Sequence, residues 1–391
     1  MKSIFLLVVT GIVAIPLLGA IPMRGADVWY IHWISLFSFS CVGVFLVLWN
    51  FHFLYTLLGI YCVYNMVFVA KQYPTSIVML VQVMFSFLSI YAISKFTKKQ
   101  RKVILWAIVV AAGIQCFWVI LQYFNLDPIF SYTKDMTLDD TVGFVGSHNQ
   151  IGVFFAVVSP VVMGVCPWLI PFVIFGLWCS TTTSTWIAFL IANGYLLYSM
   201  PCKINKRLRR SLLGVIVLIM AVCSLIFFSK FENLSYVAVK ERIDLVKNTI
   251  RDVNDGEIVL DFVKYKKSIK CNPMLGYGLG NFKRFSPMSQ YEFLYQSRQN
   301  THVYAHAHND YAEAYFDLGI IGWLLILLII IDLFYKFIIF NKSKELIIYF
   351  CCIVAQMVSA LGVFTIHTAV SGMLLIISLG LFYGEWRKIN G

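Results

Sequence analysis

Apolar runs long enough to cross a membrane follow one another along most of this chain, and they restrict its fold more than any other feature. A membrane-spanning helix needs about 20 consecutive apolar residues, because the hydrocarbon core of a bilayer is roughly 30 Å thick. Of the 391 residues, 60% are hydrophobic and only 13% are charged, which is more apolar surface than a soluble core can bury. The sequence therefore predicts an all-α, polytopic membrane protein, since helices satisfy their own backbone hydrogen bonds in lipid.

About twelve membrane helices are expected, or one or two more or fewer, depending on how the short, proline-flanked seventh run is counted. The first run resembles a signal peptide, but further spans follow it at once, so we interpret it as a membrane helix. The spans divide the chain into an N-terminal membrane bundle (1–229), a large outer loop (230–316) and C-terminal membrane helices (317–391). The expected spans are residues 4–22, 28–49, 52–70, 74–94, 103–123, 148–166, 168–180, 183–200, 212–229, 317–335, 345–365 and 367–384.

Basic residues lie in short clusters between the apolar runs and indicate how the chain is oriented. The formal net charge is +12, but charges clustered between spans are typical of cytoplasmic loops rather than of a nucleic-acid surface. Counting the expected helices puts all clusters and both termini on one side, which the positive-inside rule makes cytoplasmic. Two polar segments then face outward, and the second begins with FENLSYVAVKERIDLVKNTIRDV, which has the apolar spacing of a helix. The clusters lie at residues 95–102, 203–210, 336–344 and 387–388, and the outer segments at 124–147 and 230–316.

Three histidines close the large outer loop in the pattern H-x3-H-x-H, at His302, His306 and His308. His302 and His306 are one helical turn apart, which suits a metal site. His306 and His308 are two residues apart, so one continuous helix cannot direct all three side chains at one ion. Metal binding and loop histidines without a chemical task are both alternatives, and catalysis by one of the three is the interpretation that we favour.

His308 is the strongest candidate for that catalytic histidine. It precedes an apolar run, where Asn309 or Asp310 can cap the N-terminus of a helix that enters the membrane. Histidine titrates close to neutral pH and therefore serves well as a general base. The N–H groups and the dipole of the same helix favour an anion nearby. A base beside an anion site at the membrane surface fits chemistry on a lipid-linked phosphate.

The spacing around His308 resembles that of a known family. His308–Asn309 is followed after nine residues by Gly319, and then by Gly322, as in the H-N-x9-G-x-x-G signature of the O-antigen ligase and polymerase superfamily. This superfamily, the WaaL and Wzy group, shares the Wzy_C domain. Residues 272–282, NPMLGYGLGNF, resemble its P-x-x-G-x-G-x-G-x-F run, and residues 143–149, GFVGSHN, resemble a divergent form of its G-x-F-x-N-P-N motif. The order and spacing of these motifs carry the resemblance, together with the expected topology.

The resemblance implies a multi-pass glycosyltransferase of the bacterial inner membrane, with cytoplasmic termini and a periplasmic active site. Such enzymes take a glycan from undecaprenyl pyrophosphate, invert its configuration, and use neither a metal nor another cofactor. An O-antigen ligase transfers the glycan to the lipid A-core, which is the function we favour. The alternative is a polymerase of the Wzy type, which extends a lipid-linked repeat. The expected partners are a lipid-linked glycan, a glycan or lipid A-core acceptor, and membrane lipids, but not nucleic acid.

The resemblance also assigns roles to particular residues. A histidine at the position of His308 would deprotonate the acceptor hydroxyl or assist at the pyrophosphate, with Asn309 and Asp317 beside it in the catalytic group. Asp317 stands where the family often has Glu, and it could orient this histidine or hold an arginine. An acid that only serves the helix dipole is an equal alternative for Asp317.

Arginines are expected to neutralise the leaving pyrophosphate, and here the sequence departs from the family pattern. Ser184–Thr185–Trp186 stands where the family has Ser-Arg, and Glu257 stands where an arginine often precedes the P-x-x-G run. Other arginines of the outer loop would then take this role, although each is also explained as a solvated surface charge. The departures shift some weight from the ligase toward a divergent polymerase. The candidates are Arg242, Arg251 and Arg284.

Four further residues complete the predicted substrate-binding site. His148 and Asn149 begin a membrane run and are expected to line the same outer cavity as His308. Gly278 and Gly280 are also assigned to substrate binding, and their run at 276–282 predicts a tight turn or a close approach of the backbone.

Two other classes of membrane protein compete with the glycosyltransferase. A transporter of lipid-linked oligosaccharides has a comparable number of helices and would work in the same pathway. Transporters usually show internal repeats and ionisable residues at mid-membrane, and neither is clear in this sequence. An intramembrane metalloenzyme built on the three histidines would be expected to carry an H-E-x-x-H core, which the sequence lacks.

Overall fold

The structure, a computed structural model, describes the chain in several separate ranges. The described residues form ten α-helices, one short 3-10 turn and one two-stranded sheet. Over these residues the chain is mostly helical, as the sequence predicts. The ranges are 53–70, 73–127, 143–145, 147–180, 182–199, 232–262, 265–282, 285, 306–339, 343–363, 365–366 and 368–390, of which 73–74, 232–242, 259–268 and 390 are described by their backbone alone.

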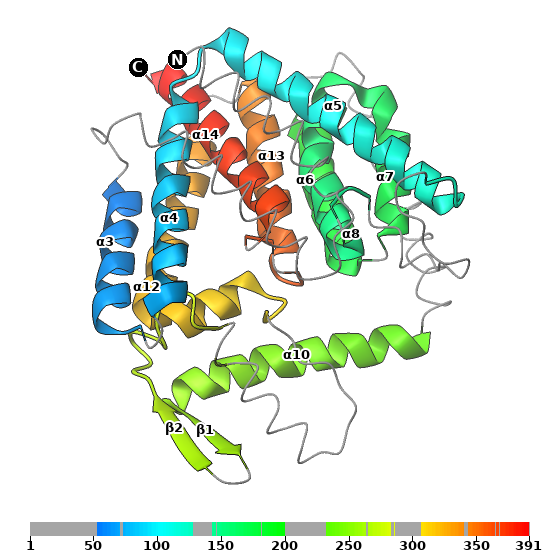
Figure 1. Cartoon of the computed structure of the whole chain (residues 1–391). Coiled ribbons are helices and arrows are strands. Elements are labelled where there is room, and N and C mark those ends of the chain that lie inside the picture. The colour runs from blue at the N-terminus through cyan, green and yellow to red at the C-terminus, as the bar shows by residue number, and fades with distance from the viewer. Residues whose placement is uncertain are drawn as a thin grey trace. The chain divides into compact units, whose positions relative to one another are not determined.

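The described elements form two compact units (Figure 1). The first unit contains the end of α4 (Tyr73–Ser94), α5 (Lys98–Tyr123), α6 (His148–Val165), η2 (Pro167–Leu169), α7 (Ile170–Cys179), α8 (Thr183–Ser199), α13 (Lys344–Ser359) and α14 (Ala369–Asn390). The second unit contains α3 (Phe53–Phe68), the rest of α4, α10 (Glu232–Asn254), β1 (Glu257–Phe262), β2 (Tyr265–Lys270) and nearly all of α12 (Asp310–Ile339). The division at 229 and 316 into membrane bundle, outer loop and C-terminal helices stays a prediction about membrane topology.

Five of the described helices are long and apolar enough to cross a membrane: most of α4, then α5, α6, α12 and most of α14. Two shorter apolar stretches, at Phe53–Phe68 and Pro167–Cys179, accompany them. A multi-pass membrane protein is therefore supported. The expected spans 4–22, 28–49 and 212–229 lie outside the described residues, so the number twelve and the outward position of the large loop stay predictions.

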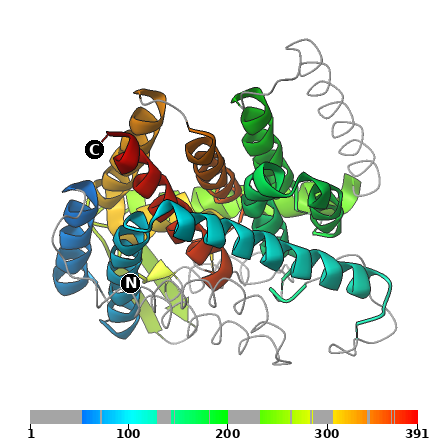
Figure 2. The same cartoon turned by 90° about the horizontal axis from the view of Figure 1, so that it is seen from above.

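In the first unit, α13 packs against α6, α8 and α14. Figure 1 shows this helix between α14 and α6, and Figure 2 shows the same helices from above. All of its side chains from Leu346 to Ile353 are buried, which is expected of a helix that is surrounded by other helices. A side chain added at Gly380 of α14 would meet Ile93 of α4 at 2.6 Å, so this glycine allows the two helices to approach closely.

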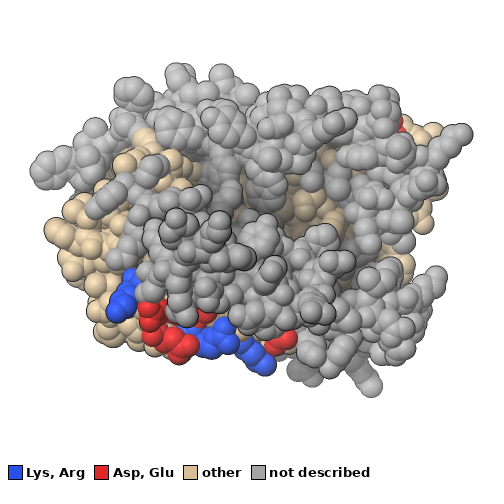
Figure 3. Space-filling model, turned by 60° about the horizontal axis from the view of Figure 1, so that its bottom comes forward, with Lys and Arg blue, Asp and Glu red and all other residues tan. Residues whose placement is uncertain are grey.

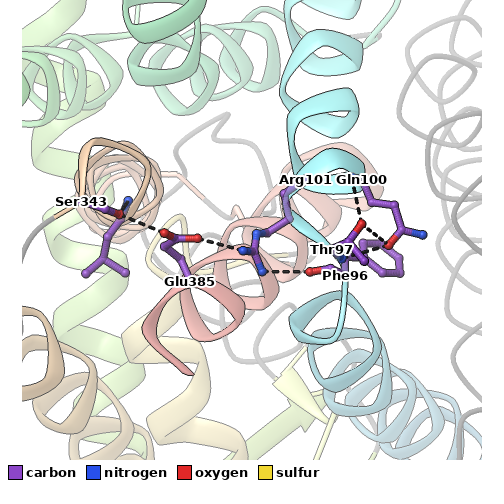
Figure 4. A network of polar contacts seen from close by, with 7 residues as sticks. Phe96, Thr97, Gln100, Arg101, Ser343 and Glu385 are labelled. Atoms are coloured by element: carbon purple, nitrogen blue, oxygen red, sulfur yellow. Dashed lines mark hydrogen bonds and ion pairs between the residues drawn. The ribbon is translucent and has the colours of Figure 1, made fainter. Parts of the chain in front are cut away.

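Arg101 belongs to the basic cluster at 95–102, yet the structure shows it as a buried charge rather than a solvated one. Its guanidinium donates to the Glu385 carboxylate at 2.9 Å and to the Phe96 carbonyl at 2.9 Å, and Ser343 donates to the same carboxylate at 3.3 Å (Figure 4). Both charged side chains are only 6% exposed. A buried ion pair persists when its groups are hydrogen-bonded, so this network joins the start of α5, the end of α14 and the residue before α13.

The second unit contains a β-hairpin that the all-α prediction missed. Strands β1 and β2 pair antiparallel, from Glu257 opposite Lys270 to Phe262 opposite Tyr265. The prediction is wrong for this segment because membrane-length apolar runs were the signal used, and six-residue strands are too short to produce one. The helix expected at the start of the large loop is confirmed as α10, which buries Leu245, Thr249 and Val253 along one face.

Candidate functional site

A break in α12 at Gly319 organises the surroundings of the predicted catalytic residues. Gly319 has φ +63° and ψ −166°, so α12 consists of a short segment, 310–318, and a longer apolar segment, 320–339. The two segments run in clearly different directions (Figure 1). A positive φ is readily adopted by glycine and strained for other residues, which explains why glycine stands at this position.

The glycine-rich segment 272–282 supplies hydrogen-bond partners for the broken helix. A helix end leaves backbone N–H and carbonyl groups without partners inside the helix. Here the carbonyls of the segment accept from the N–H groups after the break, and its N–H groups donate to the carbonyls before it. We call residues 272–282 together with the break at Gly319 the glycine bracket. After the break, the Ile320 N–H donates to the Pro273 carbonyl at 3.1 Å and the Ile321 N–H to the Met274 carbonyl at 3.2 Å. Before it, the Phe316 carbonyl accepts from the Tyr277 N–H at 2.9 Å and the Asp317 carbonyl from the Gly278 N–H at 3.0 Å.

Two glycines from separate sequence motifs meet in the glycine bracket. A Cβ atom on Gly276 would lie 2.6 Å from the Gly319 nitrogen, and one on Gly319 would lie 2.5 Å from the Gly276 nitrogen. Both residues have positive φ angles, +74° and +63°. Backbone therefore packs directly on backbone, and the P-x-x-G-x-G-x-G run and the G-x-x-G pair are two halves of one structural feature.

Asp317 ties the glycine bracket together through its side chain. The residue is 4% exposed, and its carboxylate accepts from the N–H groups of Gly280 and Phe282, both at 2.8 Å. Two backbone N–H groups therefore donate to this one buried side chain. Gly278 makes the close backbone approach expected of it, since a Cβ there would lie 2.3 Å from the Ala70 Cα atom. For Asp317 a part in catalysis, and for Gly278 and Gly280 a part in substrate binding, stay predictions.

Helix α3 closes the glycine bracket with two polar side chains. The Tyr61 hydroxyl donates to the Leu318 carbonyl at 2.6 Å, the last carbonyl before the break. Asn65 donates to the Leu275 carbonyl at 2.8 Å and accepts from the Leu279 N–H at 2.7 Å. Sequence analysis missed both residues, although their spacing of one helical turn inside an apolar run was an available signal.

An aromatic cluster joins α10 to the glycine bracket. The Tyr277 ring stacks on Phe316 with centroids 4.5 Å apart, and Phe282 packs edge-on against Phe316 at 5.1 Å. The Tyr277 hydroxyl donates to the Asp252 carbonyl at 2.8 Å. Burial raises the pKa of Tyr277, so its hydroxyl stays protonated and keeps donating to α10.

Residues 306–309, which we call the histidine turn, lead directly into α12. The Asn309 side chain accepts from the Ala312 N–H at 2.9 Å, so the predicted cap is confirmed. His308 is partly buried and has φ +51°, a left-handed conformation. For a residue with a Cβ atom this conformation costs about 1–3 kcal/mol, and it is found most often at functional sites.

His306 forms a second polar contact of the histidine turn. Its Nδ1 atom lies 3.2 Å from a carboxylate oxygen of Glu313, which is one helical turn into α12. His306 was considered as one of three histidines but not chosen as the catalytic one. Glu313 was not predicted to belong to the site, because a lone acid in the first turn of a helix is usually explained by the dipole. Among the described residues, no group of three or more His, Cys, Asp or Glu could hold a metal ion. His302 lies outside the described residues.

The glycine bracket and the histidine turn both fall within a region that matches a known protein family. Residues 168–327 match the family model Wzy_C, described as O-antigen ligase. This part of the chain is similar to the Wzy_C domain. The resemblance to the O-antigen ligase and polymerase superfamily is thereby confirmed. No curated protein matches the chain.

Of the arginines predicted to bind pyrophosphate in the Wzy_C domain, only Arg251 has a described side chain. It lies near the end of α10, is 62% exposed, and approaches Asp252 at 3.8 Å. Figure 3 shows acidic and basic side chains next to one another in a short band on the face that it draws. Arg242 lies on α10 with only its backbone described, and Arg284 lies outside the described residues. A common site for these arginines and the histidine turn stays a prediction.

His148 and Asn149 precede the residues matched by the Wzy_C model and begin α6 in the first compact unit. The Asn149 side chain accepts from the Thr182 hydroxyl at 2.8 Å, which joins α6 to the segment before α8. A cavity shared with the histidine turn stays a prediction. Thr185, where the family has arginine, is fully buried and donates to the Thr182 carbonyl at 2.7 Å.

Proposed function

We propose that the protein is a membrane glycosyltransferase of the O-antigen ligase type. It would transfer a glycan from undecaprenyl pyrophosphate to a hydroxyl of the lipid A-core, at the periplasmic face of the bacterial inner membrane. One observation carries the proposal: in a Wzy_C domain, His308 stands in a left-handed turn directly before the capped start of α12. The reaction needs no cofactor from this chain.

In this mechanism His308 accepts the proton of the acceptor hydroxyl. The hydroxyl oxygen forms a bond to the anomeric carbon, the bond from that carbon to the pyrophosphate oxygen breaks, and the leaving group keeps the electron pair. A general base contributes about 10²- to 10⁴-fold to such a rate. The developing negative charge is favoured by the N-terminus of α12 and by positive charge from Arg242, Arg251 and Arg284.

The glycine bracket supports this chemistry by holding the first segment of α12. Catalytic groups must keep their geometry within about 0.5 Å, which requires packed and hydrogen-bonded surroundings. The segment 310–318 has its final carbonyls bound by the glycine bracket and α3, and its aromatic face packed by Tyr277. The histidine turn therefore leads into a helical segment whose far end is held by hydrogen bonds and packing.

A polymerase that extends a lipid-linked repeat is the second candidate, and a specific observation favours it. The two positions where the family carries arginines hold Thr185, which is buried, and Glu257, which begins β1. The chemistry at the donor is the same in both candidates, and only the acceptor differs.

Deletion of the gene, with complementation by wild type, His308→Ala and His302→Ala, tests the proposal. Lipopolysaccharide would be separated on a gel, and undecaprenyl-linked glycan measured beside it. Loss of the whole ladder with long lipid-linked chains accumulating indicates a ligase, whereas a single repeat left on the core indicates a polymerase. We expect His302→Ala to restore the pattern and His308→Ala not to. A normal pattern with His308→Ala would contradict the catalytic assignment and favour a transporter.

A further inference from the structure

Glu313 is a buried acid beside the histidine turn that the mechanism above does not use. Its side chain is 3% exposed. One carboxylate oxygen lies 3.2 Å from His306 Nδ1, and the other accepts from the Ala307 N–H at 3.4 Å. A buried carboxylate is costly unless its oxygens are hydrogen-bonded, and both of these contacts lie in the histidine turn.

Helix α12 does not need this carboxylate as a cap. The Ala312 N–H is capped by the side chain of Asn309, and the Glu313 N–H donates to the Asn309 carbonyl at 3.1 Å. Asn309 thus caps one orphan donor of the first turn with its side chain, and its carbonyl accepts the first hydrogen bond within the helix. The Glu313 side chain instead reaches back past the cap to the two residues that precede His308.

These contacts fix both the ring of His306 and the backbone of Ala307. Donation from Nδ1 to a carboxylate selects one tautomer and one orientation of an imidazole. The side chain of His306 is 12% exposed, and Ala307 is fully buried, so both contacts are largely shielded from solvent. A left-handed residue such as His308 persists only where its surroundings determine the conformation, and Glu313 holds the segment directly before it.

We infer that Glu313 is a positioning residue of the transfer site, which holds the histidine turn so that His308 keeps its left-handed conformation. The inference rests on the function proposed for His308. Glu313 forms and breaks no covalent bond in the reaction. The acceptor proton still passes to His308, and the electron pair still leaves with the pyrophosphate.

The test uses the purified full-length enzyme in detergent, with undecaprenyl-linked glycan extracted from the deletion strain as donor and its lipid A-core as acceptor. The kcat and the KM for the donor would be measured for Glu313→Gln, Glu313→Asp, His306→Asn and His306→Ala. The control is Tyr315→Phe, which removes a 2.7 Å hydrogen bond to Asn254 from the same helix without touching the histidine turn.

We expect Glu313→Gln to lower kcat about tenfold or more with an unchanged KM, because positioning acts on the proton transfer rather than on donor binding. Glu313→Asp should recover part of the loss. His306→Asn keeps a donor to Glu313 and should retain most of kcat, whereas His306→Ala should lose it. Tyr315→Phe should behave as wild type.

Wild-type kcat in Glu313→Gln, or equal losses in His306→Asn and His306→Ala, would overturn the inference. If Glu313→Gln does not accumulate in the membrane, the comparison of His306→Asn with His306→Ala still tests the inference. If deletion of the gene changes neither the lipopolysaccharide nor the undecaprenyl-linked glycan, the proposed function is wrong, and the role of Glu313 is wrong with it. If deletion stops transfer while Glu313→Gln transfers normally, only the role of Glu313 is overturned.

Discussion

The glycine bracket and the histidine turn belong to one compact unit and one Wzy_C domain, yet they use their polar groups in opposite ways. In the glycine bracket, backbone groups and the Asp317 carboxylate bind one another and the two sides of the helix break. In the histidine turn, two partly buried imidazoles stand at the start of α12, and His306 lies 3.2 Å from a carboxylate oxygen of Glu313. The difference teaches that the glycines of the family signature are explained by packing, whereas its histidine is not.

The largest effect is expected from Gly319→Ala, which would force a Cβ atom to within 2.5 Å of the Gly276 nitrogen at a positive φ. Strain and overpacking together predict a loss of roughly 2–6 kcal/mol in the free energy of unfolding. The amount of folded protein in membranes and the Tm in detergent would measure it. Gly194→Ala is the matched control, because a Cβ there meets nothing within 4 Å. A stable Gly319→Ala protein would contradict the packing role of the signature glycine.

Asp317→Asn should have the next largest effect, because an amide keeps one acceptor but presents its nitrogen to the other N–H group. We expect a loss of about 1–3 kcal/mol, the cost of leaving a buried N–H group without an acceptor. The Tm and the rate of glycan transfer would be compared in the same preparation. Unchanged Tm with lost transfer would move Asp317 from the glycine bracket into the catalytic group.

Asn309→Ala separates capping from catalysis in the histidine turn. Loss of an N-cap side chain costs about 1 kcal/mol, and serine at the same position restores most of it. We therefore expect Asn309→Ala to lower the Tm and Asn309→Ser to recover it, with transfer following the Tm. Full stability but no transfer in Asn309→Ser would show that the amide itself takes part in the reaction.

Tyr61→Phe should have the smallest effect, since it removes one hydroxyl from the α3 side of the glycine bracket. The lost hydrogen bond to the Leu318 carbonyl predicts a destabilisation of about 0.5–1.5 kcal/mol, with transfer close to wild type. Thermal unfolding of the purified variant would measure the shift. Tyr64→Phe, on the exposed side of the same helix, is the control and should leave the Tm unchanged.

The sequence by itself determined the features that depend on neighbouring residues. Apolar runs predicted the membrane helices that lie within the described residues, and apolar spacing predicted α10. The cap at Asn309 followed from one polar residue before an apolar run, and motif order indicated the family of the Wzy_C domain. Each of these signals lies within one or two helical turns, or in the order of short motifs, so no knowledge of packing was needed.

Only the tertiary structure decided which distant groups meet. The Leu318 carbonyl finds its donor on Tyr61, 257 residues away, and Arg101 finds Glu385, 284 residues away. Asp317 binds a backbone segment 35 to 37 residues before it, which no local pattern announces. The ends of a broken helix and a buried charge both require hydrogen-bond partners. The sequence indicates that such partners are required, but not which residues supply them. Packing selects the partner, because many polar groups of equal chemistry compete for it until the chain is folded.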